Sequence, residues 1–133
     1  MPITQEILDA NNRFYAAFAN GSIRDMQDIW SADESITCIH PGQPSLQGRD
    51  NVLHSWRHIL ATKAVDISAS HVIIRHHGDV TYVLCHEHLR GGTLIATNIF
   101  ARETDGWRMI HHQAGPLPAP TSAISLKEHP TVQ

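Results

Sequence analysis

The spacing of apolar residues changes near residue 65, and this change restricts the fold more than any other feature of the sequence. Before it, apolar side chains recur at helical spacing; after it, they alternate with polar ones as in strands. Turn signals then follow at Gly78-Asp79, Gly91-Gly92 and Asp105-Gly106. The runs between these turns, 67–77, 79–90, 93–103 and 107–115, predict a meander of four long antiparallel strands.

Helices are predicted in the first half of the chain. Thr4 is the expected N-cap of the first helix, which ends at Asn20-Gly21 because glycine accepts the left-handed conformation. Ser22 is placed to cap a short second helix. A strand over 35–40, a loop over 43–47 and a third helix from Gly48 to about Ala61 follow. The predicted order is α-α-β-α-β-β-β-β, an α+β fold.

Both faces of the predicted meander carry apolar residues. One face has Val83, Cys85, Phe100 and Met109, and the other has Leu84, Ile95, Ile99 and Ile110. An antiparallel sheet with one solvated face would instead be polar on that face. The helices can cover only one side, so we expect a second copy of the chain to cover the other.

Composition excludes several classes of partner. The formal net charge is −3, and no basic stripe is present, so neither nucleic acid nor an anionic membrane is an expected partner. No run reaches the roughly 18 apolar residues of a membrane span, and the start of the chain does not resemble a signal peptide. Cys38 and Cys85 lie in apolar runs and are expected to be buried free thiols. We therefore expect a cytoplasmic protein.

Three segments of the chain resemble a known family. FYAAFANGSIRDMQDIW (14–30), IHPGQPSLQGRDNVLHSW (39–56) and TNIFARETDGWRMIHHQAGP (97–116) are similar to SnoaL-like members of the NTF2-like superfamily. The last segment is also similar to the association domain of calcium/calmodulin-dependent kinases. The resemblance covers about residues 5–117, which indicates one domain over 1–117 and an extended tail over 118–133.

The resemblance implies a cone-shaped homodimer in which a curved antiparallel sheet wraps over the helices and encloses a pocket. Because members of this superfamily range from isomerases to assembly modules, the fold does not name a reaction. Family members line the pocket from positions that match Tyr15, Trp30, His40, Trp56, Asn98 and the stretch from His111 to Gln113.

The register of the last hairpin predicts which polar residues share a face. If Asp105-Gly106 is a two-residue turn, Asn98 lies opposite Gln113 and Phe100 lies opposite His111. His111 then becomes the candidate for proton transfer, because imidazole titrates near neutral pH. His112 would point to the opposite face, at a contact between subunits. The alternative is that the polar group is a satisfied amide pair in the core.

The chain has 11 histidines in 133 residues. His71, His86 and His88 could together bind zinc if the turn at Gly78-Asp79 places His71 opposite His86. Residues two apart on a strand are, however, about 6.5 Å apart, which is too far for ligands that must converge on one ion. We therefore predict no metal and no cofactor. His54 and His58 are expected on the solvated face of the third helix.

These observations predict a homodimeric small-molecule pocket protein. As an enzyme it would be a cofactor-free isomerase, dehydratase or hydrolase acting on an apolar ligand with one polar handle. His111 would be the acid or base, with Asn98 and Gln113 orienting the ligand. Trp30, Trp56 and Phe100 would form the apolar wall, and Glu87 is the nearest carboxylate base. The alternative is a non-catalytic dimerisation or ligand-sensing module.

Overall fold

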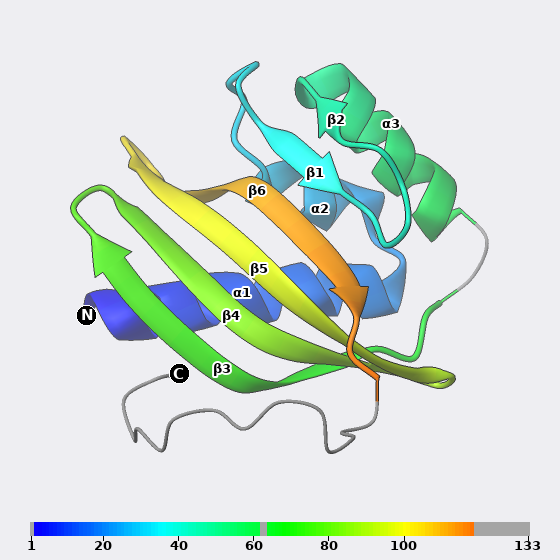
Figure 1. The fold of residues 1–133 in the computed structure, drawn as a ribbon. Coiled ribbons are helices and arrows are strands. Elements are labelled where there is room, and N and C mark those ends of the chain that lie inside the picture. Colours follow the sequence, from blue (N-terminus) through cyan, green and yellow to red (C-terminus); the bar gives the residue numbers. More distant parts are fainter. Residues whose placement is uncertain (1, 62–63, 119–133) are drawn as a thin grey trace.

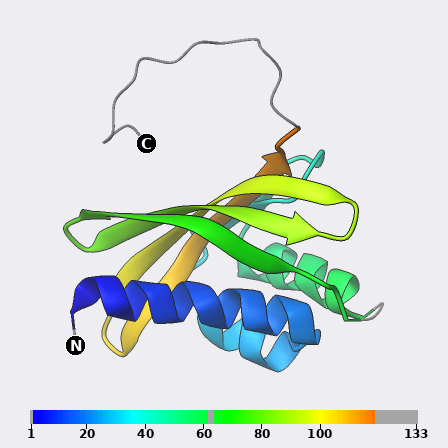
Figure 2. The ribbon, with the colours of Figure 1, turned by 90° about the horizontal axis from the view of Figure 1, so that it is seen from below.

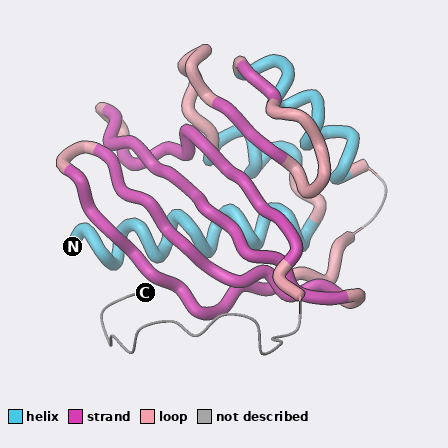
Figure 3. Tube along the Cα trace, in the orientation of Figure 1, coloured by secondary structure: helices cyan, strands magenta, loops and turns pink. Residues whose placement is uncertain are grey.

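The computed structural model describes residues 2–61 and 64–118, in which helices pack on a sheet whose four long strands follow them in the chain (Figures 1 and 3). The α+β class and the period change near residue 65 are confirmed. The elements are α1 (Ile3–Asn20), α2 (Ile23–Ile29), β1 (Thr37–Ile39), β2 (Leu46–Gln47), α3 (Arg49–Leu60), β3 (Ser68–His77), β4 (Val80–Leu89), β5 (Gly92–Glu103) and β6 (Gly106–Pro116).

The ends of the first two helices follow local chemistry. Gly21 has a φ of 67° and closes α1 in the left-handed conformation, as predicted. The Ser22 side chain accepts a hydrogen bond from the backbone amide of Asp25 at 3.1 Å and so caps α2. The predicted cap at Thr4 is wrong: the N-cap is Pro2, and α1 begins two residues earlier than predicted. The Thr4 hydroxyl instead contacts Nε2 of His76 at 3.1 Å, which joins α1 to β3.

The sheet has six strands in the order β2-β1-β6-β5-β4-β3. β3 to β6 form the predicted antiparallel meander. β1 joins β6 in parallel and makes the sheet mixed. The two-residue strand β2, which pairs with β1, falls in the segment 43–47 that was predicted to be a loop. So short a strand leaves no periodicity in the sequence from which it could be predicted.

The helices lie together on one side of the sheet (Figure 2). Their apolar stripes meet the sheet face that contains Val83, Cys85, Phe100 and Met109, which are at most 1% exposed. We call this side the inner face. The opposite side, with Leu84, Ile95, Ile99 and Thr97, is the outer face, and no described helix covers it.

The register of the last hairpin differs from the prediction. Glu103 pairs with Gly106, so Thr104 and Asp105 form the turn. A bulge then adds one residue to β6 at Ile110, and Asn98 consequently lies opposite His112 instead of Gln113. The bulge reverses the faces of the two consecutive histidines, because a shift of one residue turns each side chain to the other side of the sheet.

A second bulge lies in β3 between Ser70 and Ile73. The two-residue turn at Gly78-Asp79 is confirmed, since His77 pairs with Val80. The bulge places Ser70 opposite His86, where His71 was predicted, and His71 takes a positive φ of 55°.

Two further expectations concern the ends of the chain and membranes. Of the predicted tail 118–133, residues 119–133 lie outside the described part of the structure. Within the described ranges, none of the helices combines the length and the apolar character needed to span a membrane.

Candidate functional site

Five polar side chains are enclosed between α1 and the inner face of the sheet. Asn11 and Asn98 are fully buried, Glu87 and His112 are 1% and 2% exposed, and Tyr15 is 6% exposed. Buried polar groups are costly unless they are bonded, and a buried carboxyl is especially costly. We call these five residues the interior cluster: Asn11, Tyr15, Glu87, Asn98 and His112.

Each member is positioned by the periodicity of its own element. Asn11 and Tyr15 are four residues apart on α1, and therefore lie on one face of the helix. Glu87 is two residues beyond Cys85 on β4 and shares its inward direction. Asn98 comes from β5, and the bulge at Ile110 turns His112 of β6 to face it.

Hydrogen bonds join the interior cluster into one network. The Tyr15 hydroxyl donates to Oε2 of Glu87 at 2.6 Å. Nδ2 of Asn98 donates to Oδ1 of Asn11 at 2.9 Å and to the Tyr15 hydroxyl oxygen at 3.1 Å. Nδ1 of His112 lies 2.6 Å from Oδ1 of Asn98. Asn98 is therefore the hub, with contacts to three other members.

The network fixes the proton positions on His112. An amide oxygen can only accept, so Nδ1 of His112 must be the donor to Asn98. A neutral imidazole then has its lone pair on Nε2, which lies 3.9 Å from Oε2 of Glu87. The two groups are not an ion pair in this state. They lie opposite each other, with a base on one side and a carboxyl on the other.

Burial controls the charge of both groups. It lowers the pKa of His112 to about 3, with smaller contributions from the imidazoles of His40 and His111, so His112 is neutral near pH 7. Burial also raises the pKa of Glu87, which the hydrogen bond from Tyr15 partly offsets. Burial, with Glu87 close by, raises the pKa of the Tyr15 phenol, which therefore stays a donor. A carboxyl of raised pKa in a buried polar group is typical of acid–base sites.

Aromatic rings connect the interior cluster to the protein surface. Trp56 is fully buried, and its ring centroid is 5.8 Å from that of His112 and 4.9 Å from that of His40. Half-buried His40 contacts the Ser55 hydroxyl through Nε2 at 3.0 Å. Both residues line an open groove of about 650 Å³ between the loop after β1 and α3. Trp56 therefore contacts both a residue of the groove wall and a member of the interior cluster.

The structure brings some of the residues predicted for the site together and separates others. Tyr15, Trp30, Trp56, Asn98 and Phe100 are all buried on the helix side, and His40 contacts Trp56. His111 and Gln113 lie on the outer face, where Nδ1 of His111 contacts Thr37 at 2.7 Å and Nε2 contacts Oε1 of Gln113 at 3.1 Å. His112, predicted at a subunit contact, occupies the place that was predicted for His111.

Glu87 is the member whose place could have been found from the sequence. It is in phase with Val83 and Cys85, so strict alternation after the Gly78-Asp79 turn already places it on the inner face. The position of His112 depends on a bulge, which has no such signal. The thiols of Cys38 and Cys85 are free and buried as predicted, and burial raises the pKa of Cys38 to about 12.

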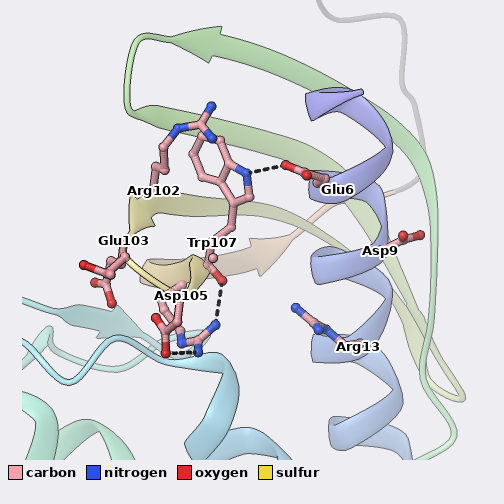
Figure 4. A pocket seen from close by; sticks show the side chains of 10 residues that line it. Glu6, Asp9, Arg13, Arg102, Glu103, Asp105 and Trp107 are labelled. Atoms are coloured by element: carbon pink, nitrogen blue, oxygen red, sulfur yellow. Dashed lines mark hydrogen bonds and ion pairs between the residues drawn. The ribbon is translucent and has the colours of Figure 1, made fainter. Parts of the chain in front are cut away.

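A charged groove of about 490 Å³ lies elsewhere, between α1 and the hairpin of β5 and β6 (Figure 4). Nε1 of Trp107 donates to Glu6 at 3.0 Å, and the Arg102 guanidinium lies 4.6 Å from the Trp107 ring centroid. Arg108 pairs with Asp105 at 2.9 Å. Most of these charged groups bond to neighbours in the same groove, so we interpret it as a clamp that holds the hairpin on α1.

Metal coordination is not supported by the arrangement of side chains. Among the residues that the structure describes, no group of three or more histidines, cysteines or carboxylates is arranged to hold an ion. His71, His86 and His88 do not form such a group. The rings of His71 and His86 instead stack on each other, with centroids 4.2 Å apart.

Comparison with known proteins identifies the family. The family model of the SnoaL-like domain matches residues 7–120, which is most of the chain, and the protein therefore belongs to the SnoaL-like family. None of the curated proteins compared with the chain matches it.

Solved structures support the same assignment. A candidate dehydratase of the NTF2-like family from Streptomyces avermitilis is 31% identical, with a TM-score of 0.79 over 86% of this chain and 96% of the other. A candidate association domain of calcium/calmodulin-dependent protein kinase type II from Thiobacillus denitrificans is 34% identical, with a TM-score of 0.71 over 82% and 93%. An NTF2-like protein from Cytophaga hutchinsonii shares the fold at 15% identity, with a TM-score of 0.73 over 88% and 100%.

Proposed function

We propose that this protein is a cofactor-free isomerase or dehydratase that moves a proton on a small apolar molecule with one polar handle. The observation that carries the proposal is the buried carboxyl of Glu87, held 2.6 Å from the Tyr15 hydroxyl and 3.9 Å from Nε2 of His112. The similarity to a candidate dehydratase supports the same class of reaction.

Four members of the interior cluster have distinct roles in this proposal. Glu87 is the acid or base, because a raised pKa brings a carboxyl closer to the pH at which proton transfer is efficient. His112 offers the lone pair of Nε2 opposite this carboxyl. The single Tyr15 hydroxyl proton, which Glu87 accepts in the absence of ligand, turns to developing negative charge on the ligand, as phenols do in oxyanion sites. Asn98 holds His112 and Tyr15 in place through its hydrogen bonds. These assignments replace the prediction of His111 as the acid or base.

The ligand reaches the cluster from the groove at His40. Trp56 contacts both His40 at the groove and His112 in the interior cluster, so entry of the ligand requires this ring to move. The groove walls combine apolar side chains with imidazole, hydroxyl and amide groups: Pro44, Leu46, Ile59, His40, His54, His58, Ser55 and Gln43. An apolar molecule with one polar group matches these walls.

Deuterium exchange tests the chemistry without knowledge of the natural substrate. A panel of small cyclic ketones is incubated with the protein in D₂O, and loss of the signals of protons next to the carbonyl is followed by NMR. We expect exchange above the buffer rate, and we expect Glu87→Gln to reduce it by about 100-fold or more.

Glu103→Gln is the matched control, because Glu103 accepts a hydrogen bond from Ser31 and lies away from the interior cluster. It should retain the rate of the unaltered protein. Absence of exchange with every ketone, or full activity in Glu87→Gln, contradicts the proposed reaction.

A second candidate is a non-catalytic association module. The similarity to a candidate kinase association domain favours it, as do the apolar residues on the uncovered outer face, among them Ile95 at 46% exposure. Both candidates include a homodimer formed through that face. Mass spectrometry of molecules that copurify with the protein separates them. A tightly held molecule that is never converted supports a binding module.

A further inference from the structure

The groove between the loop after β1 and α3 contains a serine in contact with a histidine. The loop and the helix lie side by side (Figure 1), and Nε2 of His40 lies 3.0 Å from Oγ of Ser55. Both residues line the groove, which has a volume of about 650 Å³. A serine oxygen becomes a nucleophile when a base within hydrogen-bond reach takes its proton, and this contact has that geometry.

The loop after β1 fixes the position of His40. The backbone amide of Gln43 donates to the carbonyl of His40 at 2.9 Å and closes a turn over Pro41 and Gly42. Gly42 has a φ of 72°, which glycine adopts at little cost. The His40 ring packs edge to face against buried Trp56, with centroids 4.9 Å apart. Backbone and ring are therefore both held in place in the folded chain.

The Ser55 hydroxyl is free to turn towards His40. It donates to the carbonyl of Val52 at 2.7 Å in the structure. A hydroxyl carries one proton and rotates to suit its partners, so this proton can move to Nε2 of His40 without a shift of the helix. The Val52 carbonyl lies within α3 and keeps its helical hydrogen bond when the hydroxyl turns away. The rotation therefore leaves no acceptor unpaired.

The charge of His40 suits it to accept this proton. Burial lowers the pKa of His40 below the ordinary value of about 6.5, so the imidazole is neutral at pH 7 and one ring nitrogen has a lone pair. The Cys38 thiol lies 3.7 Å from Nε2. Burial raises the pKa of this thiol to about 12, so it keeps its proton and can donate to that nitrogen. Both neighbours of Nε2 can donate, which favours the lone pair on Nε2 and the ring proton on Nδ1.

The rest of the groove wall matches an ester with a short apolar acyl chain. The wall has three apolar side chains and three that can donate hydrogen bonds through nitrogen: Pro44, Leu46, Ile59, Gln43, His54 and His58. The apolar side chains suit the acyl chain. The donors suit the carbonyl oxygen, which gains negative charge when the carbon is attacked.

We propose that Ser55 and His40 form a catalytic dyad that hydrolyses esters of short apolar acids in this groove. The activity goes beyond the proton transfer proposed at Glu87 and does not depend on it, because it takes place in the groove and needs no movement of Trp56.

The reaction proceeds in two steps that balance. Oγ of Ser55 bonds to the ester carbonyl carbon while its proton passes to Nε2 of His40; the bond from that carbon to the alcohol oxygen breaks, and the alcohol leaves with the proton. A water molecule then gives a proton to Nε2 and its oxygen to the acyl carbon. The bond from this carbon to Oγ breaks, the acid leaves, and the proton returns from His40 to Ser55.

A fluorophosphonate probe with a butyl chain tests the nucleophile directly. Oγ attacks phosphorus and fluoride leaves, so the probe stays on the residue and is located by mass spectrometry of peptides. We expect one label per chain, on Ser55, and none in Ser55→Ala. His40→Gln keeps a hydrogen-bonding group but lacks a base, and should slow the labelling by about 100-fold or more.

Hydrolysis of p-nitrophenyl butyrate measures turnover. The unaltered protein should release p-nitrophenol above the buffer rate, and Ser55→Ala should lose this activity. Ser45→Ala and His77→Gln are the matched controls and should keep it. The Ser45 hydroxyl contacts Gln47 at 3.5 Å, and exposed His77 stacks on Tyr82 with centroids 5.7 Å apart.

Absence of labelling in the unaltered protein, or a label only on residues other than Ser55, contradicts the dyad, and this result needs no variant. Hydrolysis retained in Ser55→Ala also contradicts it, since exposed imidazoles would then cleave the ester. Equal labelling rates in the unaltered protein and His40→Gln contradict the role of His40 as the base. Circular dichroism and urea unfolding verify that both variants are folded. Deuterium exchange of the ketone panel is a separate measurement, so failure here leaves the proposal for Glu87 unaffected.

Discussion

The inner and outer faces of this sheet use the same side chain in opposite ways. On the inner face His112 is 2% exposed, and its pKa lies at about 3 because burial disfavours the cation. On the outer face the imidazoles of His71, His86 and His88 contact mainly one another and hydroxyl groups. Histidine content alone therefore does not indicate function. The environment on each side of one sheet determines whether an imidazole is enclosed in the interior or lies at the surface.

The consecutive residues His111 and His112 show the same contrast between the outer and the inner face. His112 bonds to buried Asn98, whereas His111 bonds to Thr37 and Gln113 on the outer face. The bulge at Ile110 decides which of them enters the interior. Substitutions at neighbouring positions on opposite faces therefore test the comparison directly.

The largest difference is expected between Asn98→Ala and Thr97→Ala. Loss of the Asn98 amide leaves the Nδ1 donor of His112 and Oδ1 of Asn11 buried without partners. Each unsatisfied group costs about 1–3 kcal/mol, so the free energy of unfolding should fall by about 3–5 kcal/mol. Thr97→Ala, on the outer face, should cost less than about 1 kcal/mol. Urea unfolding followed by tryptophan fluorescence measures both. Equal losses would mean that the interior network contributes little.

Acid should destabilise the chain through His112. Its pKa is about 3 in the folded chain and about 6.5 when unfolded, so its contribution is complete above about 6.5 and is lost as the pH falls towards 3. At about 1.4 kcal/mol per pH unit, His112 alone accounts for about 3 kcal/mol at pH 4. Glu87 acts in the opposite direction, because its raised pKa makes the folded chain lose stability as the pH rises.

The slope of the unfolding free energy against pH isolates the contribution of His112. His112→Gln should flatten the slope between pH 6.5 and 4, and His111→Gln should leave it nearly unchanged. The carboxylates are the same in the unaltered protein, His112→Gln and His111→Gln, so their contributions cancel when the slopes are compared. An identical slope in the unaltered protein and His112→Gln would mean that His112 is protonated in the folded chain.

Much of the fold could be predicted from the sequence because it depends on repeated signals. Four alternating runs and three turns placed β3 to β6 to within about two residues, and the helical stripes placed α1 and α3. Each such signal is spread over ten or more residues, so single exceptions do not obscure it. β2 has two residues and gives no such signal.

The site was harder to predict because it depends on single residues. Tyr15, Trp56 and Asn98 were placed inside by helical spacing and family resemblance, and the structure buries them. The partner of Asn98 was predicted as Gln113, because the turn was placed one residue late and the bulge at Ile110 was not foreseen. A bulge is stabilised by tertiary packing, here of Met109 and His112 against the helices, and leaves no local pattern in the sequence.

The smallest effect is expected for His111→Ala. The substitution removes the contacts to Thr37 and Gln113 at a partly solvated position, so the free energy of unfolding should fall by about 0.5–1 kcal/mol. Deuterium exchange of the ketone panel should stay within about twofold of the unaltered protein, because His111 lies on the face opposite Glu87. Gln113→Ala is the companion variant and should behave alike. A tenfold loss of the deuterium exchange rate in His111→Ala, with stability maintained, would mean that His111 belongs to the site. It would also mean that β6 in solution lacks the bulge at Ile110, since only a shift of one residue can bring His111 to the inner face.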